Sequence, residues 1–180
     1  TTSSHEPHPI RGRAEDVILK SLDDAVNKYK ISYPVIYLEP GRSIISTSGI
    51  TLYTTGSSKH VPHGRTYVSV DGGMADNIRP AMYQAEYQAQ LANKPENINL
   101  QKVTIAGRYC ESGDILIKEI ILPEIEEGDI LCVFNTGAYN YSMAMNYNRN
   151  PRAEVVMVKD GQARTVVRRE SYEDLVRNDL

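Results

Sequence analysis

The spacing of hydrophobic and polar positions changes near residue 43. Before this point, apolar residues between Glu15 and Lys30 recur at helical intervals, with acidic residues leading and basic residues closing the run, which predicts an amphipathic helix. The apolar run at residues 34–38 predicts a buried strand, and it leads directly into Glu39-Pro40-Gly41-Arg42. The sequence therefore predicts a helix, a strand and a polar turn in its first part.

After residue 43, short segments alternate apolar residues with Ser, Thr or Tyr. We expect strands at residues 44–53, 66–70, 103–106, 115–121, 130–134, 154–158 and 164–167. Many strands at this spacing favour an antiparallel β-barrel or sandwich. Residues 78–92 are predicted to form a helix with Pro80 in its first turn, and residues 171–177 a short closing helix capped by Ser171.

A helix followed by a buried strand, with a polar turn at the strand's carboxyl end, is the repeating half-unit of an α/β barrel, whose functional residues lie at that end. A complete barrel takes roughly 250 residues, and only one such unit is present here. We therefore expect residues 1–42 to be a remnant of a truncated α/β barrel and residues 43–180 to form a separate domain, a β-barrel or a sandwich, in a protein that is mainly β.

Composition narrows the class of protein. The chain has 180 residues, of which 41% are hydrophobic, and a formal net charge of -3, so we expect a soluble globular protein that binds neither nucleic acid nor a membrane. No apolar stretch is long enough to span a bilayer. His5 and His8 have no further metal ligands nearby, so we expect a loop at residues 1–13 and no metal site.

The two cysteines fit a cytoplasmic protein, because disulfides are rare in that compartment. Cys132 lies in an apolar run, where cysteine usually behaves as a small hydrophobic core residue. Cys110 stands at the end of an apolar run, just before a Ser-Gly turn. Its thiol could face a pocket, and the alternative is a buried cysteine at a strand end.

The turn Glu39-Pro40-Gly41-Arg42 is the first candidate binding site. Proline and glycine force a tight turn, glycine lets a backbone N–H approach an anion closely, and the guanidinium group offers a bidentate fork. This chemistry suits a phosphorylated cofactor or an acidic substrate. The alternative is a surface turn with an exposed ion pair.

Three further groups are candidates for substrate chemistry. Arg79 and Tyr83 lie one helical turn apart and could clamp a carboxylate, although a solvated arginine over a core tyrosine fits the spacing equally well. Cys110 could serve as an acid or a nucleophile, and Glu111 could bind an ammonium group. The turn that ends in Tyr139 places a phenol beside flexible backbone in a loop rich in tyrosine and asparagine, and the alternative is that these tyrosines pack the loop against the rim of the barrel.

The order and spacing of these motifs resemble those of the diaminopimelate decarboxylases, pyridoxal-phosphate enzymes that join an alanine-racemase-like (β/α)8 barrel to a carboxyl-terminal β-barrel. The resemblance runs from about Glu15 to the end of the chain. It is carried by EPGRSI from Glu39, VDGGMADNIRPAMY ending at Tyr83, CESGD from Cys110, GAYNYSMAMNYNRNPRAEV from Gly137 and RRESYEDL from Arg168. It implies that residues 43–180 form a Greek-key-type antiparallel barrel like the carboxyl-terminal domain of alanine racemase.

The resemblance also implies roles for individual residues. Glu39, Pro40, Gly41, Arg42 and Tyr139 would line the phosphate of pyridoxal 5'-phosphate. Arg42, Arg79, Tyr83 and Tyr139 would contact the amino-acid substrate, Glu111 would bind its distal amino group, and Cys110 would donate a proton. The family works as a homodimer in which the cysteine and the glutamate enter the neighbouring subunit's site.

The sequence departs from the family in one respect, because the lysine that anchors the cofactor and the glycine-rich barrel loop precede anything in it. Lys20, Lys28 and Lys30 fall on the predicted helix, and the other lysines fall in β segments or turns. We therefore expect the carboxyl-terminal portion of an enzyme that converts meso-2,6-diaminopimelate to L-lysine and carbon dioxide in lysine biosynthesis. We expect this portion to be inactive alone and to bind the cofactor weakly or not at all.

Two alternatives stay open at this point. The parent protein could decarboxylate another basic amino acid, such as ornithine, arginine or carboxynorspermidine. A non-catalytic homologue could instead keep the β-barrel as a dimerisation module, although Cys110, Glu111, Arg79 and Tyr139 would then have no reason to be present together.

Overall fold

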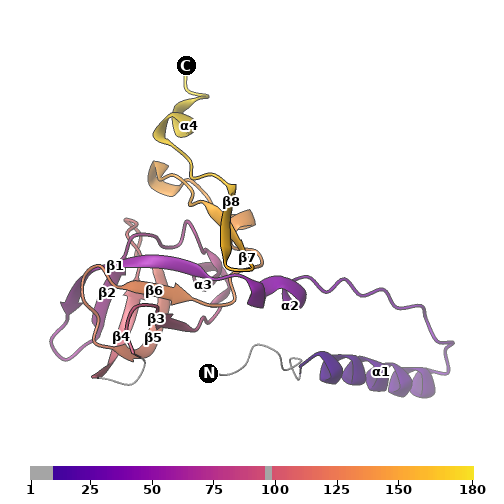
Figure 1. Cartoon of the computed structure of the whole chain (residues 1–180). Helices are drawn as coiled ribbons and strands as arrows, with labels where there is room; N and C mark the ends of the chain where they lie inside the picture. Colours follow the sequence, from indigo (N-terminus) through magenta and orange to yellow (C-terminus); the bar gives the residue numbers. More distant parts are fainter. Residues whose placement is uncertain (1–9, 96–98) are drawn as a thin grey trace. The chain divides into compact units, whose positions relative to one another are not determined.

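The computed structural model describes the backbone of residues 10–95 and 99–180 and the side chains of residues 16–95 and 99–180 (Figure 1). The chain divides into two compact units, Thr1–Glu39 and Pro40–Leu180. His5 and His8 lie outside the described residues. Whether the first unit and the Pro40–Arg42 turn derive from an α/β barrel stays a prediction.

The first unit contains helix α1 (Ile10–Tyr29), which confirms the predicted helix and begins before it. The strand predicted at residues 34–38 is wrong, because residues 31–40 have no regular secondary structure and Val35 and Tyr37 are 77% and 87% exposed. A strand of a parallel barrel is held by hydrogen bonds to neighbouring strands on both sides. No described strand pairs with this segment, so its apolar side chains have nothing to pack against.

The second unit is built on a six-stranded sheet, with strands in the order β3-β6-β1-β2-β4-β5. The strands are β1 (Thr51–His60), β2 (Thr66–Val70), β3 (Ala89–Leu91), β4 (Leu100–Ala106), β5 (Ile115–Pro123) and β6 (Ile130–Val133). All neighbours pair antiparallel except β2 and β4, which are parallel. The two edge strands β3 and β5 line one shared hollow of about 350 Å³, so the sheet curls into a nearly closed barrel and the mainly β prediction is confirmed.

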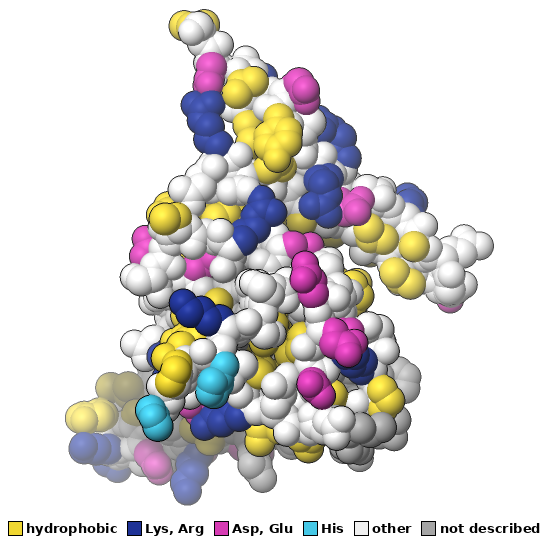
Figure 2. All heavy atoms as spheres, turned by 90° about the vertical axis from the view of Figure 1, so that its left-hand side faces the viewer, with side chains coloured by type: hydrophobic (Ala, Val, Ile, Leu, Met, Phe, Trp, Pro, Cys, Tyr) yellow, Lys and Arg dark blue, Asp and Glu magenta, His cyan; other side chains and the backbone are white. Residues whose placement is uncertain are grey.

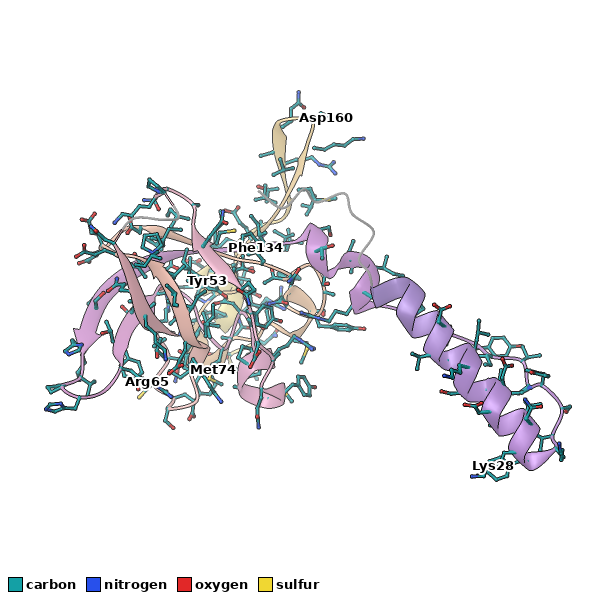
Figure 3. The ribbon with its side chains drawn as sticks, turned by 90° about the horizontal axis from the view of Figure 1, so that it is seen from below. Lys28, Tyr53, Arg65, Met74, Phe134 and Asp160 are labelled. Atoms are coloured by element: carbon teal, nitrogen blue, oxygen red, sulfur yellow. The ribbon has the colours of Figure 1, made fainter. Side chains whose placement is uncertain are left out.

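The core of this barrel comes from side chains that point inward from its strands. Val68, Ile105 and Leu131 are fully buried, and the ring of Tyr53 packs in the same cluster, as Figure 3 shows. Burying a side chain of this size contributes about 1.5–3 kcal/mol to stability. Cys132 is also buried, which confirms its predicted place in the core.

Two elements predicted before β4, the strand at residues 44–53 and the helix at residues 78–92, differ from the structure. Residues 42–48 form the short helices α2 (Arg42–Ile45) and η1 (Ser46–Ser48), so the first strand begins at Thr51 and not at residue 44. The amide of Gly137 donates to the Ser46 carbonyl at 3.0 Å and ties this helical turn to a distant loop. That contact cannot be read from local spacing.

The helix predicted at residues 78–92 is also mostly wrong. Helix α3 (Arg79–Tyr83) has proline in its first turn as expected, but it ends at Gln84, whose backbone is left-handed with φ of 54°. Residues Ala89–Leu91 form β3 and pair with β6. Pairing with a buried strand and burial of Leu91 therefore override the helical spacing of this segment.

The chain closes with a two-stranded hairpin and a short helix. Strands β7 (Val155–Lys159) and β8 (Gln162–Val167) meet at a turn marked by Asp160 in Figure 3. Helix α4 (Tyr172–Val176) has Ser171 at its N-cap, and Ser171 and Asp174 form a reciprocal capping box. The predicted hairpin strands and closing helix are confirmed to within two residues at each end.

Candidate active site

The guanidinium group of Arg42 joins the start of the second unit to the loop after β6. Its Nη1 and Nη2 atoms donate to the backbone carbonyls of Ala138 and Asn135 at 3.5 and 3.4 Å. Its charged carbon also lies 5.6 Å from the centre of the Tyr87 ring. Two backbone bonds and a ring contact hold this side chain in one orientation.

Arg79, at the start of α3, stacks between two phenol rings. Its guanidinium carbon lies 5.2 Å from the ring centre of Tyr83 and 5.7 Å from that of Tyr139. Tyr139 itself has a left-handed backbone with φ of 63°, which turns the loop sharply at this residue. We call Arg42, Arg79, Tyr83, Tyr87 and Tyr139 the arginine–tyrosine cluster.

The turn at Gly41 completes this cluster. A Cβ atom added to Gly41 would lie 2.7 Å from the phenol oxygen of Tyr139, closer than carbon and oxygen normally approach. A side chain at this position would therefore push the phenol away from the backbone. Pro40 is exposed, and Glu39 belongs to the first unit, where its side chain is exposed.

Two arginines give the arginine–tyrosine cluster a positive charge that no described carboxylate balances. Among the described residues, no carboxylate forms an ion pair with Arg42 or Arg79. The Nε atom of Arg79 and the phenol oxygen of Tyr87 are buried without a hydrogen-bond partner. Buried donors are normally satisfied, so the cluster fits an anionic ligand.

The second group of candidate residues lies on the turn between β4 and β5. Cys110 and Glu111 are both exposed at its tip. The phenol of Tyr147 donates to the Glu111 carboxylate at 3.4 Å, and its ring meets that of Tyr109 edge to face, with centres 6.0 Å apart. We call residues 109–114 the thiol–carboxylate turn. In the described part of the chain, no hydrogen bond joins this turn to the arginine–tyrosine cluster.

Buried acidic groups surround the base of the thiol–carboxylate turn. The pKa of Asp114 is raised, chiefly because burial removes its carboxylate from water, although two backbone N–H donors oppose that change. Burial also raises the pKa of Asp76, and burial together with the charge of Asp76 raises the pKa of Tyr109 to about 12. Tyr109 therefore stays protonated near neutral pH.

The structure thus groups the predicted site residues in two places. Gly41, Arg42, Arg79, Tyr83 and Tyr139 come together, while Cys110 and Glu111 form a separate exposed group. Sequence reasoning missed Tyr87, whose ring lies against the Arg42 guanidinium group. Its burial follows from closure of the barrel, so no pattern in the neighbouring sequence marks it.

The described residues form neither a metal site nor a membrane-spanning helix. Within residues 16–95 and 99–180, no group of His, Cys, Asp and Glu side chains is arranged to hold a metal ion. Among the described helices, none has the length and apolar character needed to cross a membrane. Figure 2 shows acidic and basic side chains interspersed over the visible face, without a patch of one sign.

Comparison with known proteins agrees with this geometry. The chain is 55% identical over 163 residues to diaminopimelate decarboxylase of Bacillus subtilis (strain 168), which covers 91% of this chain and 37% of that protein. It is 46% identical over 175 residues to diaminopimelate decarboxylase of Staphylococcus aureus (strain COL), covering 97% of this chain and 41% of that protein. The chain therefore spans about two fifths of the length of these curated relatives.

A solved structure shares the fold. The crystal structure of diaminopimelate decarboxylase from M. jannaschii in complex with L-lysine aligns with a TM-score of 0.77 at 36% identity, covering 92% of this chain and 37% of that one. Residues 42–137 match the family described as pyridoxal-dependent decarboxylase, C-terminal sheet domain. That range includes Arg42, Arg79, Tyr83, Cys110 and Glu111. The chain therefore belongs to the pyridoxal-dependent decarboxylases, whose C-terminal sheet domain it contains.

Proposed function

We propose that this chain supplies substrate-binding and proton-transfer groups to a pyridoxal-phosphate-dependent diaminopimelate decarboxylase, which forms L-lysine and carbon dioxide from meso-2,6-diaminopimelate. The observation that carries the proposal is the arginine–tyrosine cluster, whose two guanidinium groups have no carboxylate partner among the described residues. The family match and the names of the relatives support the same reaction.

The cluster is suited to hold two anionic groups. In our proposal Glu39, Pro40, Gly41, Arg42 and Tyr139 line the cofactor phosphate, which the close approach of the Tyr139 phenol to Gly41 supports. Arg79 and Tyr83, together with Arg42 and Tyr139, then orient the substrate carboxylate. Guanidinium groups suit this task because they offer paired donors in a fixed plane.

The thiol–carboxylate turn is suited to the other end of the substrate. Pyridoxal 5'-phosphate, when bound, supplies an electron sink for the carbanion left by loss of carbon dioxide. In our proposal the Cys110 thiol delivers a proton to that carbon, and the Glu111 carboxylate binds the distal ammonium group. Both side chains are exposed in this chain, as groups that reach into another site would be.

The separation of the two groups supports a shared site. We propose a homodimer in which the thiol–carboxylate turn of one copy completes the site formed by the arginine–tyrosine cluster of the other. We further propose that residues 1–42 belong to the cofactor-binding barrel and residues 43–180 to the β-barrel domain. With both cysteines free, a cytoplasmic enzyme is the natural setting.

The proposal is tested in the complete enzyme, with its cofactor-binding barrel present. Cys110→Ala and Glu111→Gln are compared with Gly113→Ala, a change in the same turn whose added Cβ atom meets nothing within 4 Å. We expect Cys110→Ala to lower kcat by about 100-fold, because general acid catalysis contributes that much, and Glu111→Gln to raise KM for diaminopimelate. Lysine formation at the normal rate by both variants would contradict the proposal.

Subunit sharing has its own test. Cys110→Ala and Arg79→Gln subunits, each nearly inactive alone, are mixed and refolded together. If each site takes groups from two copies, the mixture regains up to about one quarter of the activity of the unmodified enzyme, because one site in half of the dimers is intact. Mixtures that stay as inactive as the separate variants would contradict sharing.

A further inference from the structure

Asp114 ends the CESGD motif, and the function proposed above gives it no task. Its side chain is only 3% exposed, whereas Cys110 and Glu111 at the tip of the same turn are exposed. One carboxylate oxygen accepts from the amide of Tyr109 at 2.8 Å, and the other accepts from the amide of Met74 at 2.7 Å. Tyr109 precedes Cys110, and Met74, labelled in Figure 3, lies in a different loop.

Two glycines make room for this carboxylate. A Cβ atom added to Gly107 would lie 2.1 Å from a carboxylate oxygen of Asp114, and one added to Gly73 would lie 2.5 Å from the other. Gly73 also has a φ of +157°, at the edge of the range that side chains rarely adopt. The backbone of two loops is therefore shaped around one buried carboxylate.

The Met74 loop leads to the arginine–tyrosine cluster. Within it the amide of Gly73 donates to Asp76 at 2.9 Å, and the amides of Asp76 and Asn77 donate to the Gly73 carbonyl at 3.0 and 3.1 Å. The Asn77 side chain then accepts from the amide of Arg79 at 3.4 Å, where α3 begins. A short series of hydrogen bonds thus runs from Asp114 to the backbone of Arg79.

We propose that Asp114 is a positioning residue, whose carboxylate clamps the thiol–carboxylate turn to the loop that carries Arg79. This inference rests on the proposed function and deepens it, because it couples the groups offered to a neighbouring copy with the groups of the chain's own site. Charge-assisted bonds from two backbone amides are strong, and burial protects them from competition by water. The clamp fixes where Cys110 and Glu111 stand without itself touching the substrate.

The test uses this chain and its two cysteines. Iodoacetamide alkylation, followed by peptide mapping, reports on the turn through exposed Cys110 and on global unfolding through buried Cys132 in the same molecule. Asp114→Asn keeps the side-chain size, but its NH₂ group cannot accept a backbone N–H. We expect the rate at Cys110 to rise at least about threefold, because a released turn lets the thiol move more freely, while Cys132 stays protected.

A second variant and a matched control come from glycines of the same region. Gly107→Ala keeps the charge of Asp114 but displaces its carboxylate, so we expect faster alkylation of Cys110 here too. Gly113 lies in the turn itself, and a Cβ atom added to it meets nothing within 4 Å. We therefore expect Cys110 in Gly113→Ala to be alkylated at the same rate as in the unmodified chain. In the unmodified chain, the amide NMR signals of Tyr109 and Met74 should shift with pH at one shared midpoint, that of the Asp114 carboxyl.

Three results would overturn the clamp. Cys110 could keep its rate to within about twofold in both Asp114→Asn and Gly107→Ala, although both variants should release the turn. Cys110 and Cys132 could become reactive together, which would show a general role in barrel stability. The two amide signals could titrate with different midpoints. Normal lysine formation by Cys110→Ala enzyme would instead contradict the proposed function and leave the clamp intact.

Discussion

At the scale of single residues, the geometry around Arg79 fits the anion-binding role that we propose for it. The guanidinium group lies against the rings of Tyr83 and Tyr139, and its Nε atom is buried without a partner. Ring contacts satisfy the face of the guanidinium group but not its N–H donors, which lie in its plane. The edge of Arg79 is therefore available to an anion.

The first prediction concerns this arginine in the complete enzyme. Arg79→Gln removes a charge-assisted contact worth about 1.5–3 kcal/mol, so kcat/KM for diaminopimelate should fall by roughly 10- to 150-fold. Arg164→Gln, on the exposed strand β8, serves as the control for loss of one positive charge and should have no effect. Steady-state kinetics measure kcat/KM for both variants. Equal losses of kcat/KM would show that Arg79 does not belong to the site.

At the scale of elements, stability depends on contacts that the strands make across the barrel. Leu131 in β6 is fully buried. It pairs with Leu91 of β3 on one side and with Tyr53 of β1 on the other. Strand β6 therefore lies between β3 and β1 in the sheet. A cavity at this point would be felt by both neighbours.

We accordingly expect Leu131→Ala to lower the free energy of unfolding by about 2–5 kcal/mol, through lost burial and the cavity left behind. Leu52→Ala in β1 is the matched control, because that side chain is 57% exposed, and it should cost less than about 1 kcal/mol. Urea denaturation followed by circular dichroism gives both values. Similar losses in the two variants would contradict the assignment of the core.

A second prediction at this scale concerns Glu170, which follows β8 and fixes the loop before β7. Its carboxylate accepts from Arg152 Nη2 at 2.6 Å and from Asn146 at 2.6 Å. The hydrogen bonds from Arg152 lower the pKa of Glu170 to about 2 from its usual 4.5. A carboxyl group whose pKa is lower in the folded state than in the unfolded state stabilises the fold at pH values above its unfolded pKa. This contribution is lost as the pH falls through the folded pKa.

We therefore expect the Glu170 contribution to be complete above about pH 5 and to disappear between about pH 4.5 and pH 2. Thermal unfolding across this range is compared with that of Glu170→Gln, in which the contribution is absent at every pH. The difference in Tm between the two proteins should shrink as pH falls through this window. A difference that stays constant would show that the ion pair with Arg152 does not stabilise the fold.

At the scale of the whole molecule, the first unit exposes apolar side chains that a folded protein normally covers. Val17 and Leu19 on α1 are 63% and 58% exposed, and Val35 and Tyr37 beyond it are more exposed still. Apolar groups gathered in this way favour association. We expect the purified chain to self-associate through them.

Light scattering coupled to size-exclusion chromatography measures this association. The double variant Val35→Ser, Tyr37→Ser should shift the chain towards smaller species, because it removes apolar area from the first unit. Tyr172→Ser, which removes a 71% exposed tyrosine from α4, is the control and should leave the size distribution unchanged. A purified chain that is monomeric without any change contradicts the prediction.

The last prediction concerns catalysis by the chain alone. The chain spans about two fifths of the curated relatives that it matches, and none of its described lysines lies in the arginine–tyrosine cluster. We expect no lysine from diaminopimelate and pyridoxal 5'-phosphate with this chain, and activity when the cofactor-binding barrel is joined to it. Detectable lysine formation by the purified chain would overturn this expectation.

The sequence by itself determined the elements that local chemistry controls. Alternating apolar residues identified β2, β4, β5, β6 and the β7–β8 hairpin, and Ser171 predicted the start of α4, because these signals lie within a few neighbouring residues. The motifs around Arg42 and Arg79 likewise predicted anion binding, and the motif at Cys110 predicted an acid or a nucleophile. Each of these inferences needed only a short stretch of chain.

Only the tertiary structure decided what depends on distant partners. Residues 89–91 became a strand because β6 lies beside them, and residues 34–38 did not, because no described strand does. The parallel pairing of β2 with β4, the stacking of Arg79 on Tyr139, and the burial of Asp114 between two glycines each join residues far apart in the chain. Hydrogen bonds and burial act through space, so a pattern read along the chain cannot contain them.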